Sequence, residues 1–262
     1  MKSANSPQRI VCLTGETTET LHLLGEDERI VGISGFTSRP KEARLKAKVS
    51  AFTSAKCDRI LELRPHLVIG FSNLHAQVAH DLIQAGVNVL ITNQRSVEEI
   101  FDCILLLARV AGAEGAGAAL VDQTRGALEP VAESARGCAR RPRVFFEEWM
   151  GPRISGIRWV EKLMELACRE PVFVIIASRC GRKVVNEQIR SREGWASTDA
   201  VRDGHIYEVQ SAYLLQPGPA ALTEGVRQLH AILARVVQSE PARGLKPQEE
   251  LDPALCVKGD RR

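Results

Sequence analysis

The sequence predicts an α/β protein of two lobes, each built on a parallel sheet, with one long helix joining them. The main observation is that short apolar runs of strand length alternate with segments of helical periodicity, first over residues 8–95 and again over 142–237. A helical stretch without strands, residues 96–138, lies between these two regions. Strands that alternate with helices form parallel sheets with right-handed crossovers. We therefore expect two Rossmann-like lobes and a linking helix.

The N-terminal lobe contains four apolar runs that fit buried parallel strands. These expected strands are residues 9–13, 29–34, 67–71 and 87–91. Between them we expect a helix that carries Leu21 and Leu24, a second at 58–64 and a third at 76–85. Gly25, Pro65 and Gly86 follow these helices, as residues that end helices commonly do. The alternation gives one complete lobe.

The linking helix begins with a capping signal. Ser96 is followed three residues later by Glu99, the spacing of a capping box. Gly112, Gly115 and Gly117 interrupt the helical pattern, which resumes at 118–136. The sequence leaves open whether this is one long helix or a broken one.

The C-terminal lobe repeats the alternation in a shorter form. Its expected strands are 143–147, 172–177 and 205–209, and its expected helices are 159–167, 187–192 and 219–237. The last helix has an apolar stripe at helical spacing. Residues 239–262 are rich in Pro, Glu, Lys and Gly, so we expect a disordered tail.

Composition argues against several classes of protein. The formal net charge is only +3, with cations scattered among acids, so nucleic acid is not an expected partner. The seven cysteines are widely spaced and include no CxxC, which disfavours zinc ribbons and a disulfide framework. The N-terminus carries no secretory pattern and no run of about 18 apolar residues occurs. We therefore expect a cytoplasmic protein, or a periplasmic one if Met1 is not the native start.

Four aromatic residues fall in loops that follow predicted strands. They are Phe36, Phe52, Trp149 and Tyr213, in a chain with only 5% aromatic residues. Ligands of open parallel sheets bind beyond the carboxyl ends of the strands, and ligand pockets are lined mainly by apolar and aromatic side chains. These four are candidate ligand-binding residues, although Phe52 and Trp149 could instead cover the core.

Charged residues also gather in the loops of the C-terminal lobe. Glu147, Glu148, Arg153, Arg158 and Arg179 could bind polar or anionic groups of a ligand, because guanidinium groups suit carboxylates. The alternative is that they are solvated or pair with one another. Arg158 is our candidate ligand contact among them.

No catalytic or metal-binding signature stands out. The chain has no GxSxG, GxGxxG or P-loop motif, and Cys180 has no evident base near it in the sequence. Of six histidines, only His75 falls in a loop at the expected ligand site. We therefore expect no catalytic residue, no required cofactor and no metal held by protein side chains.

Several segments in a fixed order carry a resemblance to a known family. They are RIVCLTGETTETLHLLG, RIVGISGF, CDRILELRPHLVIGF, GVNVLITNQRSVEEI, PRVFFEEWMGPRISG and GWASTDAVRDGHIYEV. Together they span about residues 8–237 and resemble periplasmic binding proteins whose two lobes are joined by a single helix. These proteins serve ABC transporters for vitamin B12 and iron siderophores, and the likeness is greatest to the corrinoid-binding branch.

The resemblance implies a monomeric solute-binding protein that traps cobalamin or a related corrinoid in a cleft between its lobes. Phe36 and Tyr213 match positions where corrinoid binders carry aromatic residues, and His75 could approach the cobalt. A siderophore-iron complex is the second candidate ligand. Two different functions also fit the sequence: a chelatase-like enzyme on the same scaffold, dependent on His75, and an interaction protein or decayed paralogue.

Two features depart from the family pattern. Arg169, Glu170 and Pro171 leave no room for a strand and helix that family members usually have, so the second lobe is expected to be shortened. For docking to an ABC transporter, Asp58 matches the acidic residue of the first lobe, whereas the matching position in the second lobe, about Leu215, is apolar. Transporter docking is therefore expected to be one-sided.

Overall fold

The structure of the chain is a computed structural model in which two compact units are distinguished. It describes residues 6–51, 54–137, 143–150, 153–154, 160, 173–180 and 183–238. The first unit comprises Met1–Ala127 and Gln216–Thr223, and the second comprises Leu128–Leu215 and Glu224–Arg262. None of the helices in the described ranges has the length and apolar character that crossing a membrane requires.

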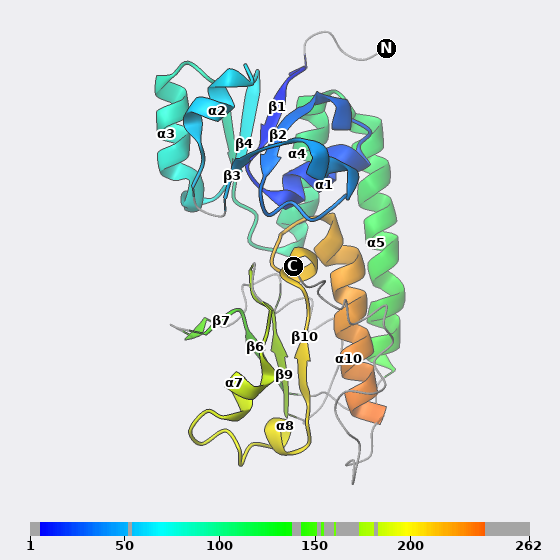
Figure 1. Cartoon of the computed structure of the whole chain (residues 1–262). Helices are drawn as coiled ribbons and strands as arrows, with labels where there is room; N and C mark the ends of the chain where they lie inside the picture. The colour runs from blue at the N-terminus through cyan, green and yellow to red at the C-terminus, as the bar shows by residue number, and fades with distance from the viewer. Residues whose placement is uncertain are drawn as a thin grey trace. The chain divides into compact units, whose positions relative to one another are not determined.

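The first unit is built on a five-stranded parallel sheet (Figure 1). The strands are β1 (Ile10–Cys12), β2 (Ile30–Ser34), β3 (Ala47–Ser50), β4 (Leu67–Phe71) and β5 (Val89–Thr92). Their order in the sheet is β3-β2-β1-β4-β5. This places β1 at the centre, where all three of its residues are buried. The order requires a crossover on either side of β1, so the loop after β1 lies where the strand order reverses.

Helices cover both faces of this sheet. They are α1 (Gly15–Leu23), α2 (Cys57–Glu62), α3 (Ala76–Gln84) and α4 (Val97–Ala111), with short 3₁₀ turns η1 (Asp27–Arg29), η2 (Glu42–Leu45) and η3 (Asn73–His75). Helices α2 and α3 pack together over a core that includes Val11, Val68 and Leu82. Helix α1 packs against α4. The four predicted strands and the predicted helices of this lobe are confirmed.

The edge strand β3 was not predicted from the sequence. Its residues read AKVS, and only Val49 and Ser50 are buried. An edge strand of four residues with half its side chains in solvent lacks the continuous apolar run that marks buried parallel strands. It pairs with β2 in parallel and extends the expected four-stranded sheet to five.

The predicted linking helix is two helices. Ser96 caps α4, because its Oγ accepts a hydrogen bond from the Glu99 backbone N–H. Gly112 ends α4 with a φ of 69°, a left-handed conformation that favours glycine. Helix α5 (Glu114–Arg136) follows, and the boundary between the two units falls inside it, after Ala127. Helix α4 thus lies wholly within the first unit, unlike the expected division at residues 96–138.

The second unit contains a three-stranded parallel sheet in the order β10-β9-β6. These strands are β6 (Arg143–Glu147), β9 (Phe173–Ala177) and β10 (Ile206–Glu208), and a short antiparallel pair, β7 (Trp149–Met150) and β8 (Arg153–Ile154), follows β6. The remaining helices of the described residues are α7 (Asn186–Arg190), α8 (Asp199–Arg202), α9 (Ser211–Leu214) and α10 (Val226–Gln238). The turn η4 (Ala221–Gly225) precedes α10 and begins in the segment that belongs to the first unit. All three predicted strands of this lobe are confirmed, with ends that differ by at most one residue.

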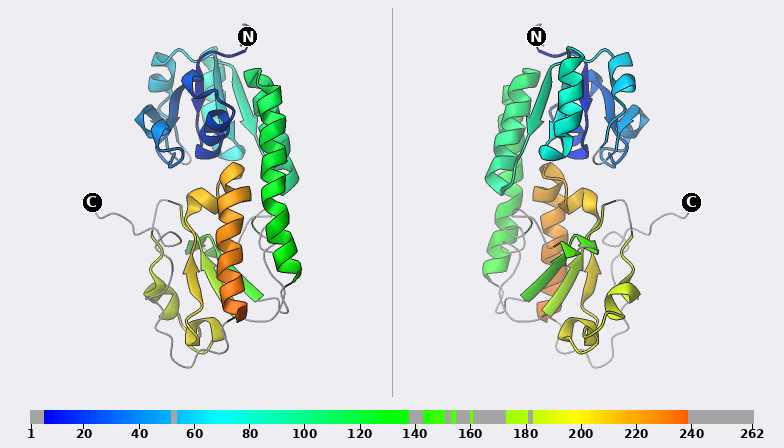
Figure 2. Two further views of the ribbon diagram at one scale, coloured as in Figure 1. Left: turned by 90° about the vertical axis from the view of Figure 1, so that its right-hand side faces the viewer. Right: turned by 90° about the vertical axis from the view of Figure 1, so that its left-hand side faces the viewer.

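Two layers of helices enclose this smaller sheet. Ile175 and Ala177 of β9 pack on one face against Ile189 of α7 and Ala200 of α8. Helix α10 runs along the other side of the sheet, as the two views in Figure 2 show. Within the described residues the second unit has three parallel strands, against five in the first, and the expected shortening of the second lobe stays a prediction. The predicted helix at 159–167, apart from residue 160, and the predicted tail at 239–262 lie outside the described residues.

Candidate ligand-binding site

In the first unit, the predicted ligand-binding loops lie at the carboxyl edge of the sheet. Phe36 follows β2 and is 44% exposed, a large fraction for a phenylalanine side chain. Its backbone is held in a turn, since its N–H donates to Ser34 Oγ at 3.2 Å. The ring is therefore available to an apolar ligand. Phe52, predicted to act beside it, lies outside the described residues.

His75 is placed differently from the sequence expectation. It is 1% exposed, and its Nδ1 accepts a hydrogen bond of 3.0 Å from the Phe71 backbone N–H. The ring packs over Gly70, where a Cβ atom would lie 3.1 Å from Nδ1. His75 thus closes the turn at the end of β4. Its role as a ligand contact stays a prediction, and this burial disfavours it.

Two buried acids that the sequence did not single out lie on α1, immediately after β1. Glu16 is 5% exposed and Glu19 is 7% exposed. Burial raises the pKa of Glu16 to about 7, and the neighbouring charge of Glu19 adds to the effect. Burial also raises the pKa of Glu19, although Arg39 at 2.9 Å opposes it. The first turn of α1 therefore carries a carboxyl group that changes its charge near neutral pH.

These acids are covered by the segment 216–220, which belongs to the same unit. A Cβ atom on Gly218 would lie 2.6 Å from the Glu16 Cβ, and Glu19 accepts a hydrogen bond from the Ala220 backbone N–H. Gln94 donates its Nε2 to the Pro217 carbonyl at 3.0 Å. The helical residues from 219 onward thus begin against a pair of carboxyl groups, where the positive end of a helix dipole favours negative charge.

Two cysteines close to Glu16 are not nucleophiles at neutral pH. Burial raises the pKa of both Cys12 and Cys103 to about 12, and the charge of Glu16 contributes in each case. The thiolate is the reactive form of cysteine. Both side chains therefore behave as small apolar groups in the core.

In the second unit, charged residues gather at the carboxyl edge of β6 and β9. Glu147 ends β6 and is fully buried, and it receives hydrogen bonds from Arg179 at 2.8 Å and from Arg192 at 3.1 Å and 2.5 Å. Burial alone would raise the pKa of Glu147, but the two guanidinium groups outweigh it and hold the pKa below its usual range. The sequence-based alternative that these charges pair with one another is therefore realised for Glu147 and Arg179.

The other predicted contacts of the second unit are only partly described. Tyr213 lies on the short helix α9 and is half-buried. Arg158 lies outside the described residues, and of Trp149 only the backbone, in β7, is described. The ligand-binding roles of these three residues stay predictions.

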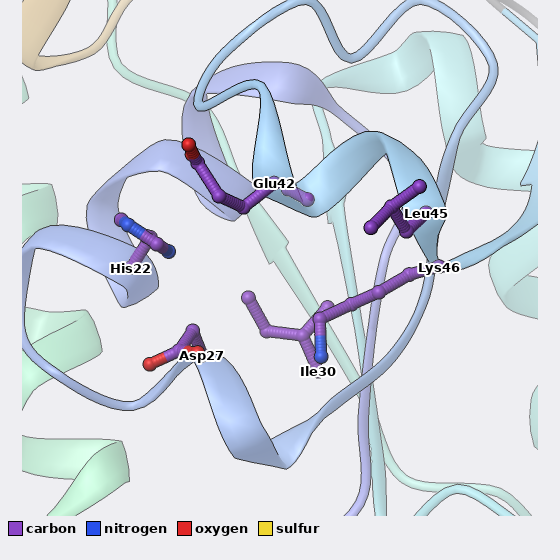
Figure 3. A pocket seen from close by; sticks show the side chains of 7 residues that line it. His22, Asp27, Ile30, Glu42, Leu45 and Lys46 are labelled. Carbon is purple, nitrogen blue, oxygen red and sulfur yellow. The ribbon is translucent and has the colours of Figure 1, made fainter.

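The first unit also has a hollow at the opposite, amino edge of the sheet. It has a volume of about 260 Å³ and is lined by His22, Asp27, Ile30, Glu42, Ala43, Leu45 and Lys46. Figure 3 shows the Ile30 side chain between those of Asp27 and Lys46. Ile30 and Lys46 mark the beginnings of β2 and β3, so this hollow lies away from the carboxyl edge where ligands of parallel sheets bind.

The described residues show no cluster of three or more His, Cys, Asp or Glu side chains that could hold a metal ion. In each unit the candidate residues thus lie at the carboxyl edge of a parallel sheet: an exposed aromatic ring and two buried acids in the first unit, and an ion-paired charged cluster in the second. Such an arrangement suits the binding of a small molecule.

The family described as periplasmic binding protein matches residues 10–172, more than half of the chain.

The chain belongs to this periplasmic binding protein family. Among its relatives is an uncharacterized ABC transporter substrate-binding lipoprotein of Bacillus subtilis, 24% identical over 85% of this chain and 79% of the relative. A vitamin B12-binding protein of Vibrio parahaemolyticus is also 24% identical, over 84% of this chain and 87% of the relative. The resemblance seen in the sequence is confirmed at the level of the family.

Solved structures confirm the fold of this periplasmic binding protein. The apo form of the periplasmic heme-binding protein RhuT from Roseiflexus sp. RS-1 superposes with a TM-score of 0.77 at 22% identity. The match covers 88% of this chain and 99% of that protein. The fold is therefore shared with proteins named for different ligands.

The expected cytoplasmic location is wrong. The family is one of periplasmic binding proteins, and the Bacillus relative is a lipoprotein that binds the substrate of an ABC transporter. The expectation rested on the pattern of the first 19 residues of the sequence, MKSANSPQRIVCLTGETTE, which does not determine location.

Proposed function

We propose that this periplasmic binding protein carries a corrinoid, cobalamin or a related compound, to an ABC transporter. The observation that carries the proposal is the match to a vitamin B12-binding protein over 84% of the chain, which includes both units. A siderophore-iron complex or another tetrapyrrole such as heme is the competing ligand. The proposed location is outside the cytoplasmic membrane.

The exposed ring of Phe36 supports a flat, largely apolar ligand. This side chain is 44% exposed at the carboxyl edge of the sheet. Because burial of apolar surface is favourable, a macrocycle that covers the ring binds more tightly. Tyr213 offers a second ring with a hydroxyl group, half-buried on α9. We infer that these two rings contact the macrocycle, and that cobalamin is a ligand rather than a cofactor.

We infer a non-enzymatic role for this protein. The family consists of binding proteins, and the cysteines nearest the candidate site, Cys12 and Cys103, are thiols at neutral pH. His75 is engaged as a hydrogen-bond acceptor in a buried turn. We propose that the protein acts as a monomer that binds and releases its ligand unchanged.

Docking to the transporter is proposed at Asp58. This residue lies exposed in the first turn of α2, where its carboxylate can meet an arginine of a partner protein. Leu215, the corresponding position expected in the other lobe, is 8% exposed. The charge available for docking at these two positions is therefore on the first unit.

The test is a titration of the purified protein with cyanocobalamin, dicyanocobinamide and heme, followed by visible absorbance and by the melting temperature. We expect the corrinoids to bind and Phe36→Ala to weaken binding about tenfold or more, because a buried aromatic contact is lost. Leu45→Ala is the matched control, since Leu45 is 91% exposed at the amino-edge hollow. Equal corrinoid affinities of the two variants would refute the role of Phe36. Binding of heme without binding of either corrinoid would mean that heme, not a corrinoid, is the ligand.

A further inference from the structure

Two guanidinium groups surround one buried carboxylate at the carboxyl edge of the second unit's sheet. Strands β6 and β9 run in parallel with Glu147 opposite Ala177, so Glu147 and Arg179 emerge at the same edge. Arg179 is 7% exposed and Glu147 is fully buried. Arg192 joins them, which places two guanidinium groups around one carboxylate.

Arg192 forms a bidentate ion pair with Glu147 and is held in place by an aromatic ring. Its guanidinium group contacts both carboxylate oxygens and lies 4.6 Å from the centre of the Trp195 ring. Trp195 in turn meets Phe145 edge-on at 5.4 Å. A bidentate ion pair backed by a cation–π contact is a strong arrangement. Glu147 is therefore neutralised by Arg192 without Arg179.

Arg179 has donors left over. One of its terminal nitrogens donates to Glu147 at 2.8 Å, while its Nε, although buried, has no hydrogen-bond partner in the part of the chain that the structure describes. The hydroxyl of the preceding residue, Ser178, is also buried and lacks a partner within those same ranges. Buried donors without acceptors are costly in a folded protein.

The acid next in the chain, Glu148, does not form the ion pair with Arg179 that Glu147 forms. Burial raises the pKa of Glu148. Its Oε2 is itself without a hydrogen-bond partner among the described residues. Glu148 and Cys180, which adjoin Glu147 and Arg179 in the chain, are half-buried.

We propose that Arg179 is the contact for an anionic group of the ligand, a carboxylate or a phosphate. The proposal rests on the proposed solute-binding function and narrows the ligand to one that carries such a group. The planar guanidinium fork suits a two-oxygen anion, and the Ser178 hydroxyl lies next to it in the chain to donate a further hydrogen bond.

Pairs of ligands that differ in the anionic group test this assignment. Cyanocobalamin carries a phosphodiester that dicyanocobinamide lacks, and heme carries two carboxylates that its dimethyl ester lacks. We expect the wild-type protein to prefer the anionic member of whichever pair it binds, by about tenfold or more. In Arg179→Gln this preference should fall to near unity, whereas a purely structural role would weaken both members of the pair equally.

Two further variants serve as controls for Arg179→Gln. Arg202→Gln removes the same charge from an exposed arginine of the second unit, so its preference should equal that of the wild type. Arg179→Lys keeps the charge beside Glu147 and should fold even if Arg179→Gln does not, with a reduced preference because the fork is lost. An unchanged preference in both Arg179 variants, or none in the wild type, would overturn the proposal.

A third probe, inorganic phosphate, separates failure of the proposed function from failure of the anion site. If neither macrocycle binds, inorganic phosphate is titrated against sodium chloride at equal ionic strength while the melting temperature is recorded. A rise with phosphate that Arg179→Gln abolishes would support the anion site although the ligand class is wrong. No difference between the two salts would overturn the site itself.

Discussion

Glu16 lies so close to Gly218, more than 200 residues away in the sequence, that a Cβ atom on Gly218 would come within 2.6 Å of the Glu16 Cβ. This approach needs the missing side chain of glycine. It buries the carboxyl group of Glu16, whose Oε1 has no hydrogen-bond partner among the described residues. This burial raises the pKa of the Glu16 carboxyl group to about 7.

The first prediction concerns Glu16 and pH. Its folded pKa lies above the ordinary 4.5, so the folded state binds more protons than the unfolded state between these values. The free energy of unfolding therefore falls as pH rises from about 4.5 to about 7, by roughly 3 kcal/mol. Glu16→Gln should remove this loss, which urea unfolding at pH 5 and pH 8 will measure. An identical pH dependence in wild type and variant would contradict the burial of an ionisable Glu16.

The second prediction concerns Glu19, which receives Arg39 and the Ala220 backbone N–H. Glu19→Ala should lower the free energy of unfolding by about 2 kcal/mol, because the buried Ala220 N–H and the partly exposed Arg39 lose a charged acceptor. Glu129→Ala is the control, since Glu129 and Arg136 form an ion pair with both side chains more than half exposed. Its effect should stay within about 1 kcal/mol. Comparable effects of the two substitutions in urea unfolding would argue against the contact with residues 216–220.

The third prediction concerns the break between α4 and α5. Gly112 has a φ of 69°, so Gly112→Ala should destabilise the protein by about 1 kcal/mol. Gly126 lies inside α5 with open space where a Cβ would stand, and Gly126→Ala should stabilise by about 0.5–1 kcal/mol. Thermal unfolding measures both. The same sign for the two substitutions would mean that the helices do not break at Gly112.

The sequence predicted the strands of both sheets well where burial produces apolar runs, as in Leu67–Phe71 and Arg143–Glu147. It missed β3, whose pattern is that of an exposed edge, and it left open whether the helical stretch breaks at the glycines that begin with Gly112. Hydrophobic periodicity shows which face of a segment is buried. It does not show an exposed edge strand or the residue at which one helix ends and the next begins.

The candidate site was harder to predict because its determinants are contacts between distant segments. Phe36 was found because an aromatic residue in a loop stands out locally. Glu16 and Glu19 read as ordinary first-turn acids of a surface helix, which stabilise a helix N-terminus. Only residues 216–220, folding over α1, make them buried. His75 likewise appeared as a loop histidine, and its burial depends on the turn that it closes with Phe71.

The central claim, that this periplasmic binding protein carries a corrinoid, is tested most directly by titrating the full chain with cyanocobalamin in a calorimeter. We predict saturable one-to-one binding, with a melting temperature that rises as ligand exceeds the dissociation constant. The absence of both heat and a shift in melting temperature at about 1 mM ligand would contradict the claim.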